Sequence, residues 1–191
     1  MKIVLASASE RRIELLKRLT ENFSVIVSGF DEESVSFEGD FEDYVISLSK
    51  GKALSTSKKI NEGALILACD TVVAYQNKLL EKPKSKEEAI DMLKILSGNR
   101  HKVYSGITVL DTESGKSISD YAVTEVVFSK LDDNEILKYV DTGEPMDKAG
   151  SYGIQGIGGT FVEEIHGCFY NVVGLPLNKL KKMLRGMGAN L

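Results

Sequence analysis

A run of five apolar residues, 65–69, meets a single acid, Asp70, before the apolar pattern resumes at 72–73. An uninterrupted run of this length predicts a strand that is buried on both faces. We expect this strand to end at the acid, where a carboxylate is costly unless it is paired, bound to a metal or at the edge of a cleft. Because ligands of open α/β sheets collect at the carboxyl ends of strands, Asp70 is the first candidate for chemistry. An acid that caps the following turn or binds a nearby arginine would give the same pattern.

Further apolar runs and helical stripes predict the other elements. A chain of 191 residues is typical of one domain or of two small lobes that share a sheet. The fourth helix is expected to bury Ile136, Leu137 and Val140. The predicted strands cover 2–6, 24–28, 103–111, 117–128 and 160–165, with a hairpin turn at 76–78, and helices begin near Ser9, Phe41, Ser85, Asp132 or Asp133, and Pro176.

The first strand leads into a helix whose start carries two serines, Ser7 and Ser9, and two adjacent arginines, Arg11 and Arg12. Ser9 is a good helix N-cap, and the free N–H groups at a helix N-terminus form a ready anion site. Arginine can bind a phosphate through two parallel hydrogen bonds. The stretch therefore indicates a phosphate site, although a capped amphipathic helix with solvated arginines would look the same.

Other charged residues are ambiguous without tertiary context. Three consecutive acids, 31–33, could help to hold a divalent cation through oxygen ligands, although a solvated loop is the more common meaning. Lys50 and Lys52 lie further along the next helix, and lysines near a helix end usually face water. His101 is expected to be a structural or loop histidine rather than a metal ligand, because the only other histidine is His166.

The stretch 143–159 is rich in glycine, but Tyr152, Ile154 and Ile157 interleave with the glycines, so it is not a flexible linker. Glycines allow close approach of the backbone to a ligand. Lys148 and Gln155 are polar groups within this frame. We therefore expect the stretch to line a binding site.

Composition narrows the class of protein. Apolar residues make up 42% and charged residues 27% of the chain, the balance of a soluble globular protein. The net charge of −4 argues against a broad nucleic-acid surface, so an anionic ligand needs a local basic cluster. Cys69 and Cys168 lack a metal-binding spacing and fit a reduced, cytoplasmic setting. No run is long enough for a signal-peptide core or a membrane span.

Motifs that span nearly the whole chain, in order, resemble the Maf family of nucleoside triphosphate pyrophosphatases. One departure is Glu10, where the family usually has proline, but both residues suit a first helical turn. The matching motifs are Ser7-x-Ser9-x-Arg11-Arg12-x-x-Leu15-Leu16, Ala68-Cys69-Asp70-Thr71-Val72-Val73, Lys82-Pro83, Leu96-Ser97-Gly98 with His101-x-Val103, Glu144-Pro145-x-Asp147-Lys148-Ala149-Gly150-x-Tyr152-Gly153-Ile154-Gln155-Gly156, and Val173-Gly174-Leu175-Pro176.

The resemblance implies one Maf-like domain over residues 1–191, with a mixed α/β fold similar to that of inosine triphosphatases. In this fold an elongated central sheet is flanked by helices, two lobes enclose a cleft, and the protein is commonly a homodimer. The implied reaction hydrolyses a nucleoside triphosphate between the α and β phosphates, giving a nucleoside monophosphate and pyrophosphate. It also implies a divalent metal, Mg²⁺ or Mn²⁺, and no nucleic-acid or membrane partner.

The resemblance also implies roles for individual residues. Asp70 would accept the proton, and Glu32 would lie near the metal or the water, so that both acids would bind the metal. Arg12, Thr71 and Gln155 look like the version of the site that acts on dTTP and UTP. The groups implied around the phosphates are Ser7, Ser9, Arg11, Lys52, Lys82 and Lys148, of which Lys52 and Lys82 would assist catalysis.

Two alternatives remain open. The protein could be a pyrophosphatase for 7-methyl-GTP or inosine triphosphate, whose family members differ at the positions of Arg12, Thr71 and Gln155. It could instead be a regulatory protein that inhibits septum formation by binding a partner, without catalysis. A screen for pyrophosphate release over many nucleotides separates these alternatives, because a binding protein would release none.

Overall fold

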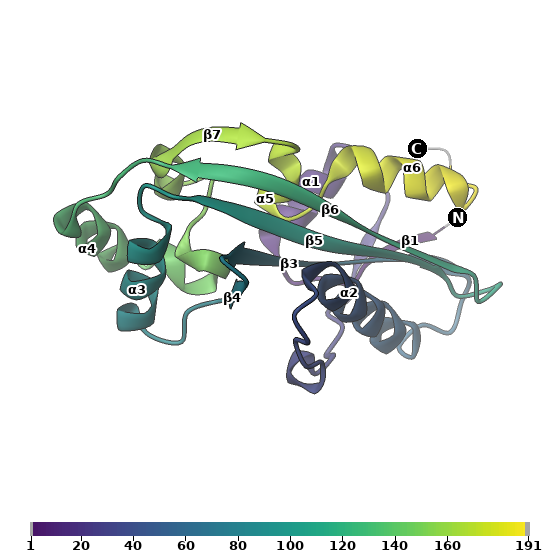
Figure 1. The fold of residues 1–191 in the computed structure, drawn as a ribbon. Coiled ribbons are helices and arrows are strands. Elements are labelled where there is room, and N and C mark those ends of the chain that lie inside the picture. Colours follow the sequence, from purple (N-terminus) through teal and green to yellow (C-terminus); the bar gives the residue numbers. More distant parts are fainter. Residues whose placement is uncertain (1, 190–191) are drawn as a thin grey trace. The chain divides into compact units, whose positions relative to one another are not determined.

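The computed structural model describes residues 2–189. Within them, seven strands form one sheet in the order β2-β1-β3-β5-β6-β7, with β4 paired to β3 (Figure 1). β1 is parallel to β2 and β3, whereas β4 and β7 are antiparallel to β3 and β6. The predicted mixed α/β fold is therefore confirmed. The strands are β1 (Lys2–Leu5), β2 (Ser24–Val25), β3 (Ala64–Tyr75), β4 (Lys78–Leu80), β5 (Arg100–Asp111), β6 (Ser117–Phe128) and β7 (Val162–His166).

Helices flank the sheet, and the chain divides into two compact units. The first unit comprises residues up to Asp70, Ser105–Ala122 and the chain from Gly174, and the second comprises Thr71–Tyr104 and Val123–Val173. The α-helices are α1 (Glu10–Lys17), α2 (Phe41–Ser57), α3 (Lys86–Leu96), α4 (Asp133–Asp141), α5 (Phe169–Val173) and α6 (Leu177–Gly186). Four short 3₁₀ helices are η1 (Glu32–Ser34), η2 (Glu144–Asp147), η3 (Ala149–Ser151) and η4 (Ile157–Phe161).

The core of the first unit lies between β1, β3 and α2. Asp40 caps α2, because its side chain accepts hydrogen bonds from the N–H groups of Glu42 and Asp43. Small side chains such as Ala53 allow the helix to approach the strands. The cluster consists of Val4, Ala6, Ala53, Ala64, Ile66, Ala68 and Leu110.

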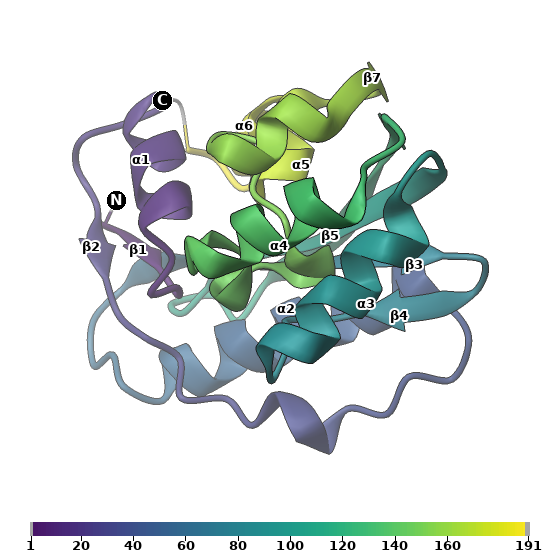
Figure 2. The ribbon, with the colours of Figure 1, turned by 90° about the vertical axis from the view of Figure 1, so that its left-hand side faces the viewer.

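The core of the second unit includes the buried side chains of α3 and α4, two helices that lie side by side (Figure 2). Ser85 caps α3 as predicted, since its side chain accepts from the N–H of Glu88. Asp132 caps α4 in a reciprocal capping box with Glu135. Leu137 does not join the buried stripe as expected but is 50% exposed. The apolar side chains that α3 buries are Ala89, Met92, Leu93 and Leu96.

Several strand boundaries differ from the prediction: β2 ends at Val25 rather than at residue 28, and β5 begins at Arg100 rather than at residue 103. The difference that bears on the site is that β3 continues through Asp70 to Tyr75. The segment Val73–Tyr75 pairs with β4, and this pairing extends the strand past the acid. The strand that ends nearby is β1, whose last residue, Leu5, pairs with Leu67. Asp70 therefore follows the end of its parallel neighbour rather than the end of its own strand. The turn at Gln76 and Asn77, with φ angles of 46° and 64°, is confirmed.

His101 is a buried structural residue on β5, and not a loop residue. Its Nε2 lies 2.8 Å from the Tyr152 hydroxyl, and the rings of Phe128 and Tyr152 meet it edge-on. Its Nδ1 has no hydrogen-bond partner among the described residues. Burial lowers the pKa of His101 from its ordinary value of 6.5 to about 4. The neutral imidazole is therefore the form that the folded second unit accommodates.

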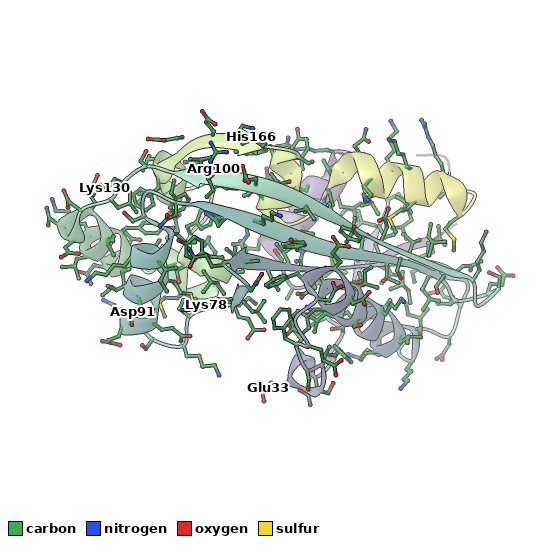
Figure 3. All side chains as sticks on the ribbon, viewed as in Figure 1. Glu33, Lys78, Asp91, Arg100, Lys130 and His166 are labelled. Carbon is green, nitrogen blue, oxygen red and sulfur yellow. The ribbon has the colours of Figure 1, made fainter. Side chains whose placement is uncertain are left out.

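This histidine should make the protein less stable as the pH falls from 6.5 toward 4. Across that range the unfolded chain binds a proton at His101 while the folded chain does not, so the loss reaches about 3 kcal/mol in the free energy of unfolding. Urea unfolding between pH 4 and pH 7 should show a shallower pH dependence for His101→Gln than for the wild type. His166→Gln is the matched control, since His166 lies at the surface (Figure 3). Equal slopes in all three proteins would contradict the prediction.

Candidate functional site

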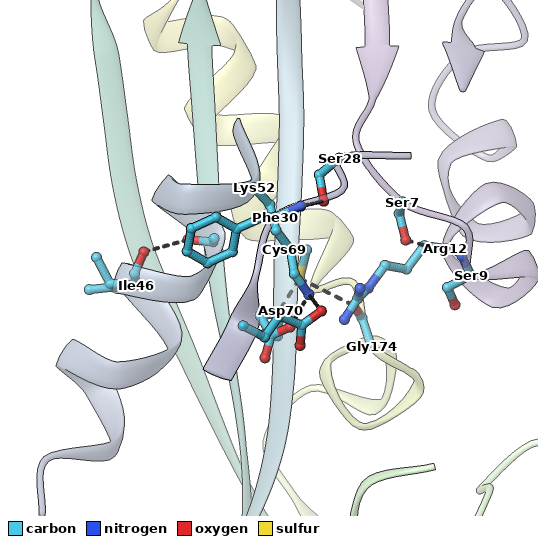
Figure 4. A network of polar contacts seen from close by, with 12 residues as sticks. Ser7, Ser9, Arg12, Ser28, Phe30, Ile46, Lys52, Cys69, Asp70 and Gly174 are labelled. Atoms are coloured by element: carbon cyan, nitrogen blue, oxygen red, sulfur yellow. Dashed lines mark hydrogen bonds and ion pairs between the residues drawn. The ribbon is translucent and has the colours of Figure 1, made fainter. Parts of the chain in front are cut away.

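A buried lysine joins two acids in the first unit. Lys52 lies on α2, where its Nζ forms an ion pair with Oδ1 of Asp70 (Figure 4). The same Nζ lies 2.9 Å from Oε1 of Glu32. The alternative that Lys52 simply faces water is excluded, because α2 continues to Ser57 and buries this side chain. The structure thus brings together three of the residues that the resemblance implicated.

The two acids differ in their surroundings. The side chain of Asp70 is 10% exposed, whereas that of Glu32 is 54% exposed. An ion pair out of water is screened little and is costly to break, while an exposed pair contributes little. Asp70 therefore depends on Lys52 more than Glu32 does. The cluster of two carboxylates and one ammonium retains a formal charge of −1, which a further cation could balance.

The donor set of this cluster fits a divalent metal. Both carboxylates already contact one cation, the Lys52 ammonium, so their oxygens converge on one region. Mg²⁺ and Mn²⁺ prefer oxygen ligands, and Mg²⁺ commonly uses one or two carboxylates together with substrate phosphates. Within residues 2–189 no group of three or more His, Cys, Asp or Glu side chains is arranged as a metal site. Further ligands would have to come from water or a bound phosphate.

Within the same unit, α1 is joined to β3 through the Gly174 carbonyl. The guanidinium of Arg12 donates from Nε to the Gly174 carbonyl at 2.9 Å, and the Cys69 thiol donates to the same oxygen at 3.2 Å (Figure 4). Cys69 immediately precedes Asp70, so this carbonyl connects α1 with the strand that carries the candidate base. Gly174 has a φ angle of 122°, a backbone conformation that only glycine adopts easily.

The serines between β1 and α1 are placed in part as predicted. Ser9 is the N-cap residue of α1, but its side chain makes no capping hydrogen bond. The Ser7 hydroxyl instead accepts from the N–H of Ser9 at 3.1 Å. Ser7 is buried, whereas Ser9, Arg11 and Arg12 are half-buried. The helix start therefore keeps polar groups partly accessible, as an anion site requires.

The remaining predicted contacts, Thr71, Lys82, Lys148 and Gln155, belong to the second unit. Lys82 is exposed after β4, and Thr71 is half-buried on β3. Lys148 donates from Nζ to the Glu144 carbonyl at 2.7 Å and pairs with Asp147 at 2.6 Å. Its ammonium is therefore held within its own loop.

Glu144 organises the glycine-rich loop, a role that was not predicted. Its carboxylate accepts hydrogen bonds from the Tyr139 hydroxyl at 2.9 Å and from the N–H groups of Ile157 and Gly158 at 3.0 and 3.1 Å. Burial alone would raise the pKa of Glu144, but these hydrogen bonds and the charge of Lys148 lower it overall. The carboxylate is thus favoured in its ionised form.

Several glycines of this loop leave room for side chains of the loop or of neighbouring elements. A Cβ on Gly156 would lie 2.5 Å from the Glu144 carboxylate, and one on Gly153 would lie 2.5 Å from Cε of Lys148. Other glycines of the stretch lie against neighbouring elements, since a Cβ on Gly150 would lie 2.8 Å from Val73 and one on Gly158 would lie 2.5 Å from the Tyr139 hydroxyl. That the stretch also lines a binding site stays a prediction. In the sequence, this packing was indicated only by the glycines themselves, such as Gly153 and Gly156, following the acid Glu144.

Gln155 lies on an exposed turn whose backbone is fixed on both sides. The N–H of Gly153 donates to the Tyr139 hydroxyl at 3.1 Å, and Tyr139 in turn donates to Glu144, which holds the N–H of Ile157. None of the hydrogen bonds described for residues 2–189 involves the side chain of Gln155. Its amide is presented outward from a fixed backbone.

Comparisons with known proteins match this chain along its whole length. A family model described as Maf-like protein matches residues 2–187. The dTTP/UTP pyrophosphatase of Clostridium botulinum (strain Kyoto / Type A2) is 59% identical over 191 residues, which cover 99% of this chain and 98% of that protein. The dTTP/UTP pyrophosphatase of Clostridium novyi (strain NT) is 58% identical over 191 residues and covers 100% of both chains.

A solved structure shares the fold. The Staphylococcus aureus Ham1 protein matches with a TM-score of 0.51 over 98% of this chain and 100% of that one, at 16% identity. At that identity the likeness concerns the fold alone. In the described residues no helix is long and apolar enough to cross a membrane.

The ion pairs predict that replacing Lys52 destabilises the protein more than replacing Asp70 does. Lys52→Met should lower the free energy of unfolding by about 3 kcal/mol, because it leaves the buried Asp70 without its cation. Asp70→Asn should cost less, since Lys52 keeps Glu32 as a charged partner. The double variant should recover part of the loss, because no buried charge is then unpaired. Urea unfolding of the four proteins measures this cycle, and strictly additive costs would show that the two side chains are not coupled.

Proposed function

We propose that this chain, which belongs to the family of Maf-like proteins, hydrolyses dTTP and UTP to the nucleoside monophosphate and pyrophosphate. Relatives of that name are 58% and 59% identical over essentially the full length. The observation that carries the proposal is the Lys52 ammonium held between the carboxylates of Asp70 and Glu32. The same unit carries the half-buried arginines and the serine hydroxyls at the start of α1.

The chemistry of phosphoryl transfer suits these groups. A nucleoside triphosphate carries about four negative charges, and enzymes catalyse its cleavage mainly by positioning and by charge stabilisation. Lys52 and Arg11 would stabilise charge on the phosphate oxygens, and the polar groups at Ser7 and Ser9 would donate hydrogen bonds to them. In the second unit, Lys82 and Lys148 are the proposed phosphate contacts, on the strength of the family motifs.

Asp70 is the proposed general base. Its carboxylate would orient a water molecule and take its proton as the water oxygen bonds to phosphorus. The bond between the α and β phosphates breaks in the same reaction, and its electrons leave with pyrophosphate. Lys52 holds the carboxylate in place from α2, so the base does not depend on a flexible loop for its position.

A divalent cation, Mg²⁺ or Mn²⁺, is part of the proposal. The carboxylates of Asp70 and Glu32 would hold it, because their oxygens converge and carry one more negative charge than Lys52 balances. When bound, such an ion neutralises charge on phosphate oxygens. We further propose a cytoplasmic homodimer that binds neither nucleic acid nor membranes, in keeping with the family resemblance and the net charge of −4.

Gln155 is the proposed reader of the base. Uracil and thymine present N3–H as a donor and O4 as an acceptor, which one Gln amide can match. The fixed turn around Gln155 supports this role because it limits where the amide can reach. A contact of the amide with Thr71, which belongs to the same unit, would fix its orientation and exclude cytosine, whose donor and acceptor are reversed.

A pyrophosphate-release screen tests the reaction. We expect release from UTP and dTTP well ahead of CTP, ATP, GTP, inosine triphosphate and 7-methyl-GTP, and only when Mg²⁺ or Mn²⁺ is present. Asp70→Asn should abolish release while the protein stays folded and still binds UTP, because the proton acceptor and one proposed metal ligand are lost but the phosphate contacts remain. Release from no nucleotide would favour the regulatory alternative, and a preference for 7-methyl-GTP or inosine triphosphate would favour the purine one. Near-normal turnover by folded Asp70→Asn would remove Asp70 as the base.

Base selectivity gives a second test. Gln155→Glu should lower kcat/KM for UTP and dTTP by about tenfold or more, because a carboxylate cannot donate to O4. Gln76→Glu is the matched control, since Gln76 is the other glutamine and lies exposed in the β3–β4 turn of the same unit. Unchanged selectivity in Gln155→Glu, or equal turnover of UTP and CTP by the wild type, would show that Gln155 serves only the loop.

A further inference from the structure

The loop that carries Glu32 is fastened to α2 by side chains from the helix and from the residues just after it. Ser55 donates from its hydroxyl to the Ser28 carbonyl at 2.7 Å, and Lys59 donates from Nζ to the Val27 carbonyl at 2.7 Å. Lys52 adds the ion pair with Glu32 at 2.9 Å. These contacts recur at helical spacing, so residues 27–32 follow one face of α2.

Between these contacts, the ring of Phe30 packs directly on the backbone of α2 at Gly51, which has no side chain. A Cβ built on Gly51 would lie 2.2, 2.5 and 2.6 Å from three ring atoms of Phe30. Figure 4 shows the Phe30 ring beside α2, next to Lys52. Glycine is a poor residue for a helix interior, and one at such a place usually has a packing or functional reason. Here the reason is the space that the ring occupies.

The position of this ring sets the position of Glu32. Phe30 precedes Glu32 by two residues and Gly51 directly precedes Lys52. Glu32 is itself exposed, and in the part of the chain that the structure describes its side chain has no polar partner other than Lys52. The carboxylate therefore depends on its own loop for its place beside Lys52.

We propose that Phe30 and Gly51 are positioning residues: the Phe30 ring, seated on Gly51, holds Glu32 against Lys52 for the reaction. The inference rests on the proposed function. A side chain at position 51 displaces the ring, and the loop then carries Glu32 away from Lys52. Because Glu32 is proposed to act near the metal or the water, its displacement lowers kcat rather than raising KM.

Gly51→Ala tests the proposal, with Gly186→Ala as the matched control. Gly186 is also helical and in the first unit, but an added Cβ there meets nothing within 4 Å. Gly51→Ala should lower kcat for UTP by about 10- to 100-fold with little change in KM, the size of effect that a misplaced catalytic group produces. Its melting temperature should change little, because the helix preference of alanine offsets the packing that is lost when the Phe30 ring is displaced. Gly186→Ala should keep the wild-type kcat.

Two further variants separate positioning from a general structural defect. Phe30→Ala removes the ring that packs on Gly51 and creates no clash, so it should give a similar loss of kcat. In a Glu32→Gln background, Gly51→Ala should cause no further loss, because the residue through which it acts is already gone. Hydrogen exchange should be faster at the N–H groups of Ser34 and Val35, which close η1, in Gly51→Ala but not in Gly186→Ala.

The outcomes distinguish this inference from the proposed function. A wild-type protein that releases no pyrophosphate from any nucleotide overturns the proposed function, whereas the exchange measurement still reports whether the ring holds the loop. Normal kcat in Gly51→Ala and Phe30→Ala, with an active wild type, overturns the positioning role alone. A loss of kcat that is as large in the Glu32→Gln background also overturns it, because the effect would not pass through Glu32.

Discussion

The buried ion pair between Asp70 and Lys52 is the constraint on which the first unit depends. A carboxylate among the apolar residues of β3 requires a cation, and the nearest source is a helix packed on the sheet. α2 must therefore present Lys52 toward β3, on the face that also buries Ala53 and its neighbours. The Lys52 ammonium also pairs with Glu32. The need to neutralise Asp70 therefore fixes the positions of β3 and α2 and provides a charged partner for the exposed loop that carries Glu32.

The second unit also contains a partly buried carboxylate, that of Glu144, which is stabilised mainly by hydrogen bonds. The carboxylate of Glu144 accepts hydrogen bonds from Tyr139 and from two backbone N–H groups of the glycine-rich loop, and the charge of Lys148 adds to their effect. The carboxylate fixes a segment that has little regular structure. In both units a carboxylate places a residue of the proposed site: Asp70 through α2, and Glu144 through the turn at Gln155.

In both units a glycine leaves space that a side chain from elsewhere in the unit occupies. Gly51 and Gly156 leave room for another side chain, the Phe30 ring in one case and the Glu144 carboxylate in the other. The sequence shows that a glycine is present but not what fills the space. This is why the glycine-rich stretch was expected to approach a ligand, whereas its described close contacts are to other residues of the protein.

The sequence by itself determined most of the secondary elements, the buried stripe of α3, the cap at Ser85, and the choice of Asp70 as a charge among apolar residues. These features depend on neighbours within a few positions, which periodicity and capping rules describe. Only the tertiary structure decided that Lys52 is buried, that β3 continues past Asp70, and that Gly174 joins Arg12 to Cys69. Each of these depends on a partner far along the chain, and local patterns carry no record of which distant residue folding brings into contact.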